Sequence, residues 1–200
     1  TVGEVSWSGQ NSGTGATVSN ANGSANHPGI RTFATGTSSN GYAGINLKLA
    51  AITPQGGDYW ETQLRFVNIV GKVLRCGIQN SFTSNDNSNG YYFEYDQLVS
   101  PNWQICAADN AVRTKTTTST AVSTNWQALS IQVDNANAVA YYSVGSSAQA
   151  LVQVGTVNTN LPTSARVIGW SYIFANNSTN ATSGTCYVDY HYHRNRNISR

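Results

Sequence analysis

Hydrophobic and polar residues alternate with a period of two along most of this chain. In the segment YAGINLKL, for example, Ile45, Leu47 and Leu49 fall on one face and polar residues on the other. This alternation is typical of half-buried β-strands, and no 11-residue window shows helical spacing. The pattern therefore predicts an all-β protein with minimal helix.

The alternation predicts short strands at nearly regular spacing, separated by turn residues. We expect strands at Glu4–Trp7, Ile30–Ala34, Tyr42–Leu49, Tyr59–Val70, Lys72–Gln79, Tyr91–Leu98, Trp126–Val133, Ala138–Val144, Ala150–Val154, Arg166–Phe174 and Thr185–His193. Gly71 lies between two of them and predicts a tight hairpin. Strands of this length and spacing indicate a two-sheet sandwich or jelly roll.

A chain of 200 residues is long enough to bury about 70% of its unfolded surface in one core. We therefore expect residues 1–200 to form a single domain. Residues 1–29 are rich in Gly, Ser and Asn and predict a loop-rich N-terminal segment, and residues 191–200 form a basic tail. The polar run 81–90 predicts a surface loop.

The charge of the chain is low. Charged residues make up 10% of it and the formal net charge is +2, whereas ordinary globular proteins contain about 25% charged residues. Nucleic-acid binding requires clustered Lys and Arg, so we expect no nucleic-acid partner. No apolar run approaches the ~18 residues of a membrane span, so we expect no membrane partner either.

The three cysteines, Cys76, Cys106 and Cys186, lie inside strand-like runs with apolar neighbours. This setting favours buried free thiols, because Cys behaves as a small hydrophobic residue. A single disulfide between two of them is the alternative.

The stretch from Gly90 to Thr116 has the highest density of aromatic residues, and its first strand has two different faces. In an extended chain Tyr91, Phe93 and Tyr95 point one way, which predicts a core face. The other face carries Tyr92, Glu94 and Asp96.

Sugar binding requires flat rings for stacking together with amide and carboxylate partners for hydroxyl groups. Five residues of this stretch supply both and are the candidate glycan-binding residues: Tyr92, Glu94, Asp96, Asn102 and Trp103. Alternatively, the two carboxylates are solvated or paired with Arg65, Arg75 or Arg113 on neighbouring strands.

Other kinds of site have weaker support. Asp189, His191 and His193 share one face of the last predicted strand, with Val188, Tyr190 and Tyr192 on the other. Zinc sites usually need more protein ligands, so we expect no metal and no cofactor; if a hard cation is bound, calcium is the first candidate. No nucleophile elbow or phosphate-binding loop occurs.

Several motifs, in their order along the chain, resemble a known family. They are HPGIRTFATGT, GYAGINL, NGYYFEYDQ, NWQICAADN, WQALSIQVDN, VAYYSVG, NLPTSAR and YVDY. Together they resemble the concanavalin A-like lectin/glucanase domains found in bacteriophage structural proteins. The resemblance implies a jelly roll of two antiparallel sheets and a place on a phage particle.

The same fold is shared by laminarinase-type enzymes with an E-x-D-x-E motif. Glu94 and Asp96 match its first two acids, but the third position is Leu98. Without that acid a glycosidase lacks a partner at the required spacing, unless a distant Asp109 or Asp134 replaces it.

We therefore expect a non-enzymatic phage virion component, a fibre or capsid-decoration domain on the particle surface that adheres to surface glycans. Its expected partners are other virion proteins, a host-surface glycan and further copies of itself. The alternatives are a carbohydrate-binding module that recognises a host glycan and a glycan-cleaving enzyme.

Overall fold

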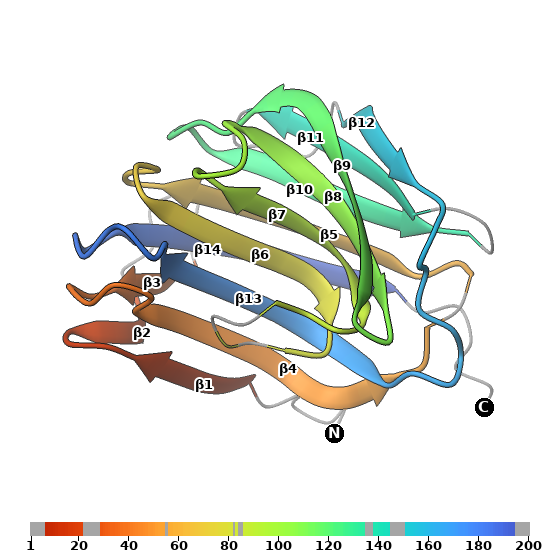
Figure 1. The fold of residues 1–200 in the computed structure, drawn as a ribbon, viewed down its shortest axis with the longest axis horizontal. Coiled ribbons are helices and arrows are strands. Elements are labelled where there is room, and N and C mark those ends of the chain that lie inside the picture. Colours follow the sequence, from red (N-terminus) through yellow and green to blue (C-terminus); the bar gives the residue numbers. More distant parts are fainter. Residues whose placement is uncertain are drawn as a thin grey trace.

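The computed structural model describes residues 7–21, 29–54, 56–81, 83, 86–134, 138–144 and 151–194. All regular elements in these ranges are strands, which form two antiparallel seven-stranded sheets (Figure 1). The prediction of an all-β jelly-roll sandwich is thereby confirmed. Among the described residues no helix is long and apolar enough to cross a membrane.

The sheets are named A and B, and their strands are given in spatial order. Sheet A contains β1 (Trp7–Ser12), β4 (Tyr42–Ile52), β13 (Ile168–Asn176), β6 (Lys72–Gln79), β7 (Gly90–Asp96), β8 (Asn102–Asp109) and β9 (Val112–Ala121). Sheet B contains β12 (Val152–Val157), β11 (Ala138–Val144), β10 (Gln127–Val133), β5 (Tyr59–Phe66), β14 (Thr185–Arg194), β3 (Arg31–Thr35) and β2 (Ala16–Asn20).

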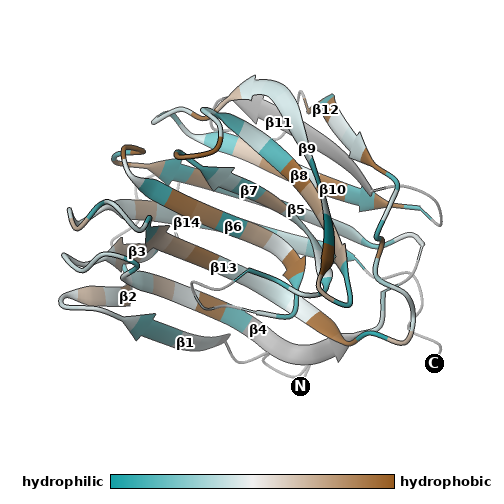
Figure 2. Ribbon diagram, in the orientation of Figure 1, coloured by the Kyte–Doolittle hydropathy of each residue, from teal (hydrophilic) through white to brown (hydrophobic). Residues whose placement is uncertain are grey.

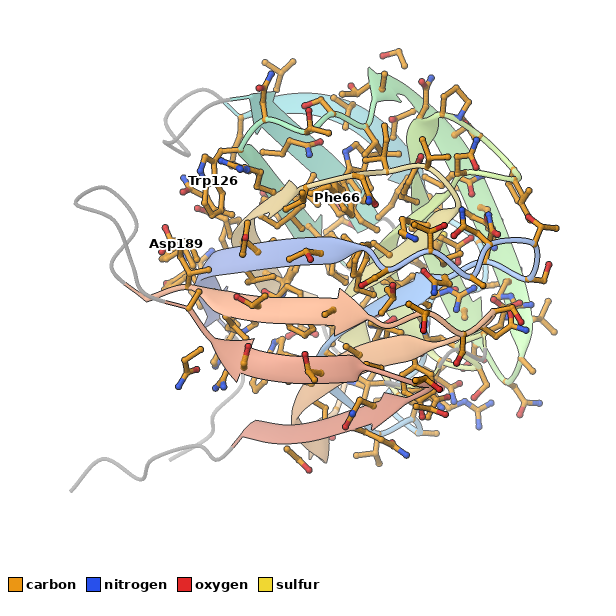
Figure 3. All side chains as sticks on the ribbon, turned by 90° about the vertical axis from the view of Figure 1, so that its left-hand side faces the viewer. Phe66, Trp126 and Asp189 are labelled. Atoms are coloured by element: carbon orange, nitrogen blue, oxygen red, sulfur yellow. The ribbon has the colours of Figure 1, made fainter. Side chains whose placement is uncertain are left out.

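The core lies between the facing sides of the two sheets and is rich in aromatic rings. The ring of Phe66 on β5 lies 6.0 Å from that of Trp103 on β8 and 5.7 Å from that of Phe174 on β13, measured between centroids. Side chains from both sheets fill this space in Figure 3, where Phe66 is labelled. Burial of such large apolar rings is the main stabilising contribution in a sandwich of this kind.

Strand β7 presents the two faces that its sequence predicts. Tyr91, Phe93 and Tyr95 are all buried in the core. The opposite side of sheet A, called the outer face from here on, carries Tyr92 and Glu94, which are buried as well, as are all eight residues of the neighbouring β6. Apolar and polar bands therefore alternate along the central strands of sheet A in Figure 2.

The predicted hairpin at Gly71 is wrong. β5 is hydrogen-bonded to β10 and β14, whereas β6 is hydrogen-bonded to β13 and β7 in the other sheet. Residues 67–71 carry the chain from one sheet to the other. The apolar faces of both strands, with Trp60 on β5 and Leu74 on β6, then point into one core.

Two other parts of the chain differ from their expected form. The N-terminal segment, expected to be loop-rich, contributes β1 at the edge of sheet A and β2 at the edge of sheet B. The 81–90 segment, expected on the surface, includes Asn87, which is fully buried. The cysteines are free and buried, as predicted.

We predict that Trp103→Ala lowers the free energy of unfolding by about 3–5 kcal/mol, the usual cost of removing a large buried ring. The Trp103 ring is fully buried, and its indole Nε1–H donates to Gln127 Oε1 over 3.0 Å. Chemical denaturation measures the change. Val152→Ala is the control at a 63% exposed position and is expected to change stability by less than about 0.5 kcal/mol; equal effects of the two substitutions would contradict the core assignment.

Candidate functional site

The polar side chains of the outer face of sheet A are aligned by strand register. Arg75 on β6 lies opposite Glu94 on β7, Glu94 lies opposite Gln104 on β8, and Gln104 lies opposite Thr117 on β9. Directly opposite residues in antiparallel strands have Cβ atoms about 5 Å apart. The pairing thus builds a polar row across four adjacent strands.

Five charged side chains form one ion-pair network on this face: Arg75, Asp86, Glu94, Arg113 and Lys115. Arg75 Nε binds Glu94 Oε2 over 2.6 Å, and Arg75 Nη2 binds Asp86 Oδ1 over 2.6 Å. The second oxygen of Asp86 binds Arg113 Nη2 over 2.7 Å. The second oxygen of Glu94 binds Lys115 Nζ.

Glu94 is the deepest member of this network. Its side chain is 0% exposed, and each of its oxygens binds a cation. A buried charge is strongly destabilising unless it is paired, so these two contacts are what allow a carboxylate at this depth. Burial opposes the charge of Arg75, but the charges of Glu94 and Asp86 outweigh it and raise the Arg75 pKa.

The segment that ends at Gly90 packs onto the outer face and brings Asp86 into the network. Asn87 donates to Gln79 Oε1, and Gln79 donates to the carbonyl of Ser171 over 3.2 Å.

Gly77 on β6 has a φ of 147°, and a Cβ on it would lie 2.6 Å from the carbonyl oxygen of Tyr91. Only glycine fits there.

Two polar atoms on the same face are buried without a hydrogen-bond partner among the described residues. They are the hydroxyl of Tyr92 and Oε1 of Gln104. Burial raises the pKa of Tyr92 well above its ordinary value, so this hydroxyl remains protonated and able to donate. Buried polar groups without partners are costly, and each one requires an explanation.

A depression of about 190 Å³ opens beside the network. Its lining includes Arg75, Asp96 and Leu98. Asp96 is half-buried, and its Oδ1 accepts a hydrogen bond of 3.0 Å from the backbone N–H of Leu98. Asp96 is thus the more accessible of the two carboxylates on the outer face of β7.

The structure separates the five candidate glycan-binding residues. Tyr92, Glu94 and Asp96 share the outer face, but Tyr92 and Glu94 are fully buried and Asp96 is half-buried. Trp103 belongs to the core, with its ring turned away from this face. Asn102 is half-buried, and its side-chain amide donates to the carbonyl of Thr118 over 2.9 Å.

Arg65, Arg75 and Arg113 are the predicted alternative partners of Glu94 and Asp96. Arg75 does pair with Glu94, whereas Arg113 pairs with Asp86, and two members of the network were missed. Lys115 lies in a run of threonines on β9. The alternating pattern of this run is a signal for a polar strand face. Asp86 lies in a polar loop, where no periodic signal marks a contact with the sheet. Only the folded chain brings it to Arg75.

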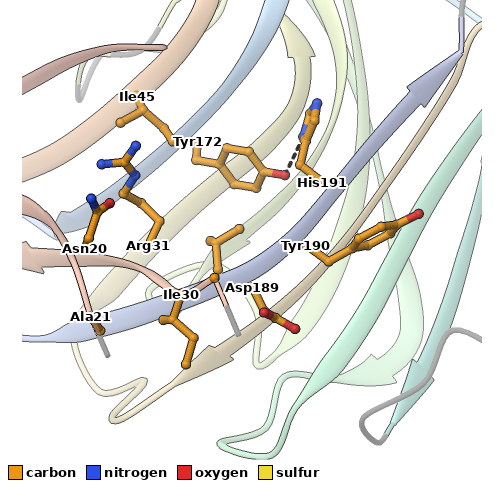
Figure 4. Close-up of a pocket in the computed structure, with 11 residues that line it drawn as sticks. Asn20, Ala21, Ile30, Arg31, Ile45, Tyr172, Asp189, Tyr190 and His191 are labelled. Atoms are coloured by element: carbon orange, nitrogen blue, oxygen red, sulfur yellow. Dashed lines mark hydrogen bonds between the residues drawn. The ribbon is translucent and has the colours of Figure 1, made fainter. Parts of the chain in front are cut away.

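A second region of interest is a cavity of about 460 Å³ between the sheets (Figure 4). Arg31 and residues 188–191 of sheet B line it, together with Ile45 and Tyr172 of sheet A. In Figure 4 the Tyr172 hydroxyl points to His191, and the Tyr190 ring points away from it.

The hydrogen bonds beside this cavity form a chain in which the donor of each bond can be assigned. The hydroxyl of Tyr172 donates to Thr62 Oγ1 over 2.8 Å, and Thr62 donates to the carbonyl of Tyr190 over 2.6 Å. The Tyr172 oxygen therefore accepts from Nδ1–H of His191, 2.8 Å away. Nε2 of His191 then accepts from Nδ1–H of His193, 3.3 Å away, so the His191 imidazole is neutral.

Burial lowers the pKa of both histidines. The pKa of His191 falls to about 3, because it is desolvated and has His193 as a neighbour. The pKa of His193 is lowered by burial, and its ring stacks on Trp170 with centroids 3.6 Å apart.

The predicted common face of Asp189, His191 and His193 is wrong, because β14 contains a β-bulge. Val188 lies opposite Leu64 and Tyr190 lies opposite Gln63, so Asp189 is an extra residue. The bulge shifts the alternation by one residue. Val188 and the two histidines consequently point inward, while Tyr190 and Tyr192 are exposed. Within the described ranges no group of three or more His, Cys, Asp or Glu could hold a metal ion.

Comparison with known proteins identifies a family. The model of the family described as SO2946-like, C-terminal domain, matches residues 26–189. The crystal structure of a protein of unknown function, SO2946 from Shewanella oneidensis MR-1, is similar with a TM-score of 0.65 and 14% identity, over 92% of this chain and 75% of that one. A search of curated proteins found no match.

Other solved structures with this fold act on or recognise carbohydrates according to their names. A GH131 β-glucanase catalytic domain from Podospora anserina is 12% identical with a TM-score of 0.57, over 85% of this chain and 73% of that one. The carbohydrate recognition domain of Emp47p is 10% identical with a TM-score of 0.57, over 94% and 88%. A β-1,3-glucanase from Mycobacterium marinum and a glycosyl hydrolase family protein from Mycobacterium fortuitum are also similar.

These comparisons correct the expected function. The predicted non-enzymatic phage virion component is contradicted, because several structural neighbours are glycoside hydrolases or β-glucanases and those reported above include no phage protein. The concanavalin A-like fold in the predicted resemblance is supported, and its link to phages is not. Identities of 10–14% show a shared fold only.

The lowered pKa values of the two buried histidines predict a loss of stability in acid. Between pH 6.5 and about 4, an unfolded chain protonates His191 while the folded chain does not, so the free energy of unfolding falls as the pH falls, by up to about 1.4 kcal/mol per pH unit. Denaturant titrations at several pH values measure this slope. His191→Asn keeps a donor toward Tyr172 but does not titrate, so we expect a shallower slope for it; identical slopes would contradict the assignment.

Proposed function

The chain belongs to the SO2946-like C-terminal domain family, and we propose that it is a glycan-cleaving enzyme that binds its glycan on the outer face of sheet A. The similarity of the fold to glycoside hydrolases and β-glucanases supports this proposal. The polar row and the ion-pair network on this face supply groups that bind sugar hydroxyls and stabilise charge.

The observation that carries the proposal is the pair of carboxylates on β7. Glu94 and Asp96 are two residues apart and lie on the same face of a strand in the middle of sheet A. Most glycoside hydrolases use two carboxyl groups on either side of the scissile bond, one to donate a proton and one to attack or to activate water. The outer face of β7 supplies two carboxyl groups, and Asp96 is the one that lines the depression.

The surroundings of the two carboxylates suggest different roles for them. Glu94 is fully buried and both its oxygens accept from cations, so it is the charged carboxylate that stabilises the developing oxocarbenium ion electrostatically from beneath the face. Asp96 is half-buried beside the 190 Å³ depression and has one oxygen bonded to a backbone N–H. Asp96 is therefore the proton donor, a role that Leu98, at the third position of the E-x-D-x-E motif, cannot take.

We predict that the protein releases oligosaccharides from a β-glucan or an acidic polysaccharide, and that Glu94→Gln and Asp96→Asn each lower the rate at least 100-fold. Loss of an acid, base or nucleophile usually costs about 10² or more. Product release is followed by chromatography or a reducing-sugar assay. Asp109→Asn is the matched control, because Asp109 pairs with Arg166 over 2.6 Å outside the network and its loss should leave the rate unchanged.

Glu94→Gln leaves Arg75 buried with one carboxylate fewer, so circular dichroism and a thermal melt must accompany its assay. Asp96 is less buried, and its substitution tests the proposal even if the Glu94 variant does not fold. Binding of glycans without any product from the wild type, or full activity in a folded Asp96→Asn variant, would contradict the proposal.

A further inference from the structure

We propose that the Arg75–Arg113 pair is the binding site for the carboxylate of an acidic sugar, a uronate, and that Asp86 occupies this site in the free chain. The inference rests on the proposed function, because it assumes that a glycan lies on the outer face of sheet A. It adds the class of glycan, a polysaccharide that contains uronic acids.

The geometry around Asp86 is that of a bound carboxylate ligand. One oxygen binds Arg75 over 2.6 Å and the other binds Arg113 over 2.7 Å, so a single carboxylate bridges two guanidinium groups. Arginine is the preferred partner of carboxylates in such sites, because its planar, fixed donors match the two oxygens. A uronate carboxylate has the same planar shape and the same charge.

The two carboxylates of the network differ in how readily they can be exchanged. Glu94 is 0% exposed and is held between Arg75 and Lys115. The Asp86 side chain is 41% exposed and belongs to the segment that covers the sheet, not to the sheet itself. A carboxylate from solution can therefore replace Asp86 without disturbing Glu94.

The charge balance favours such a replacement over simple loss of Asp86. Among the described residues the network contains three cations and two carboxylates, and loss of Asp86 would remove the carboxylate that bridges Arg75 and Arg113. Like charges brought together in a partly buried site repel one another. An incoming carboxylate restores the balance, whereas a neutral sugar does not.

The orphaned polar atoms of this face complete the site. The Tyr92 hydroxyl on β7 and Gln104 Oε1 on β8 are buried and have no partner among the described residues. Their strands lie between β6, which carries Arg75, and β9, which carries Arg113 and Lys115. Both atoms are buried in the free chain, and a pyranose ring that takes the place of the Asp86 segment offers a partner of the required kind to each, because sugar hydroxyls both donate and accept.

The test is isothermal titration with a short oligogalacturonate and with the same oligomer after reduction of its carboxyl groups. We expect the wild type to bind the acidic oligomer at least 10-fold more tightly than the reduced one, with weaker binding at higher salt. Asp86→Asn removes the internal competitor and should tighten binding of the acidic oligomer about 3- to 10-fold. Arg113→Gln, at a side chain that is 28% exposed, should weaken it at least 10-fold.

Three controls make the outcome specific. Asp109→Asn removes a carboxylate outside the network and should leave the affinity for both oligomers unchanged. The reduced oligomer should bind wild type and Asp86→Asn with the same affinity. A gain in affinity for both oligomers would show only that the segment of Asp86 has loosened, and it would overturn the inference. Preference for a sulfated oligosaccharide without carboxylates would overturn it too.

The inference and the proposed function fail in different ways. Cleavage of a neutral β-glucan that depends on Glu94, with no preference for the acidic oligomer, would overturn the uronate site and leave the enzyme. Tight binding of the acidic oligomer that responds to Asp86→Asn and Arg113→Gln, without any cleavage, would support the uronate site and contradict the enzyme.

Discussion

The arrangement of the outer face depends on one constraint, the negative charge of Glu94 on β7, an interior strand of sheet A that is buried on both faces. Glu94 has no access to solvent and therefore needs cationic partners. Strand register supplies Arg75 directly opposite it on β6, and Lys115 reaches it from β9. Another nitrogen of Arg75, Nη2, binds Asp86 and so ties its segment to the sheet.

The two faces of sheet A accordingly serve different purposes. The inner face is built from apolar side chains and aromatic rings that pack against sheet B and stabilise the fold. The outer face combines paired charges with one buried hydroxyl and one buried amide oxygen that have no partner among the described residues, an arrangement that contributes little to stability. Such costly polar groups in one place are a common mark of a functional surface.

Local patterns in the sequence predict the strands and their faces. The alternation at Tyr91, Phe93 and Tyr95 places these residues in the core, and β6 and β11 have the expected bounds. Sheet membership is a different matter, because a period of two is the same for a hairpin and for a crossing between sheets, and Gly71 permits both. The bulge at Asp189 has no sequence signal of its own, so the faces of β14 beyond it are predicted one residue out of phase.

The candidate site is predicted only in part, for a similar reason. Glu94 and Asp96 are visible in the sequence because they are two residues apart on one strand. Asp86 and Lys115 join them through pairing between strands and through a loop contact. Trp103 is a plausible sugar platform in the sequence, but the register of β8 turns it inward. Strand pairing and a loop contact, and not spacing along the sequence, therefore decide which side chains share this face.

The most direct measurement of where a glycan binds is a set of NMR spectra recorded while an oligosaccharide is added to the labelled protein. We expect the shifted signals to come from the outer face of sheet A, at Arg75, Glu94, Gln104 and Lys115, and to leave the cavity beside His191 unchanged. Shifts confined to that cavity or to sheet B would contradict the account.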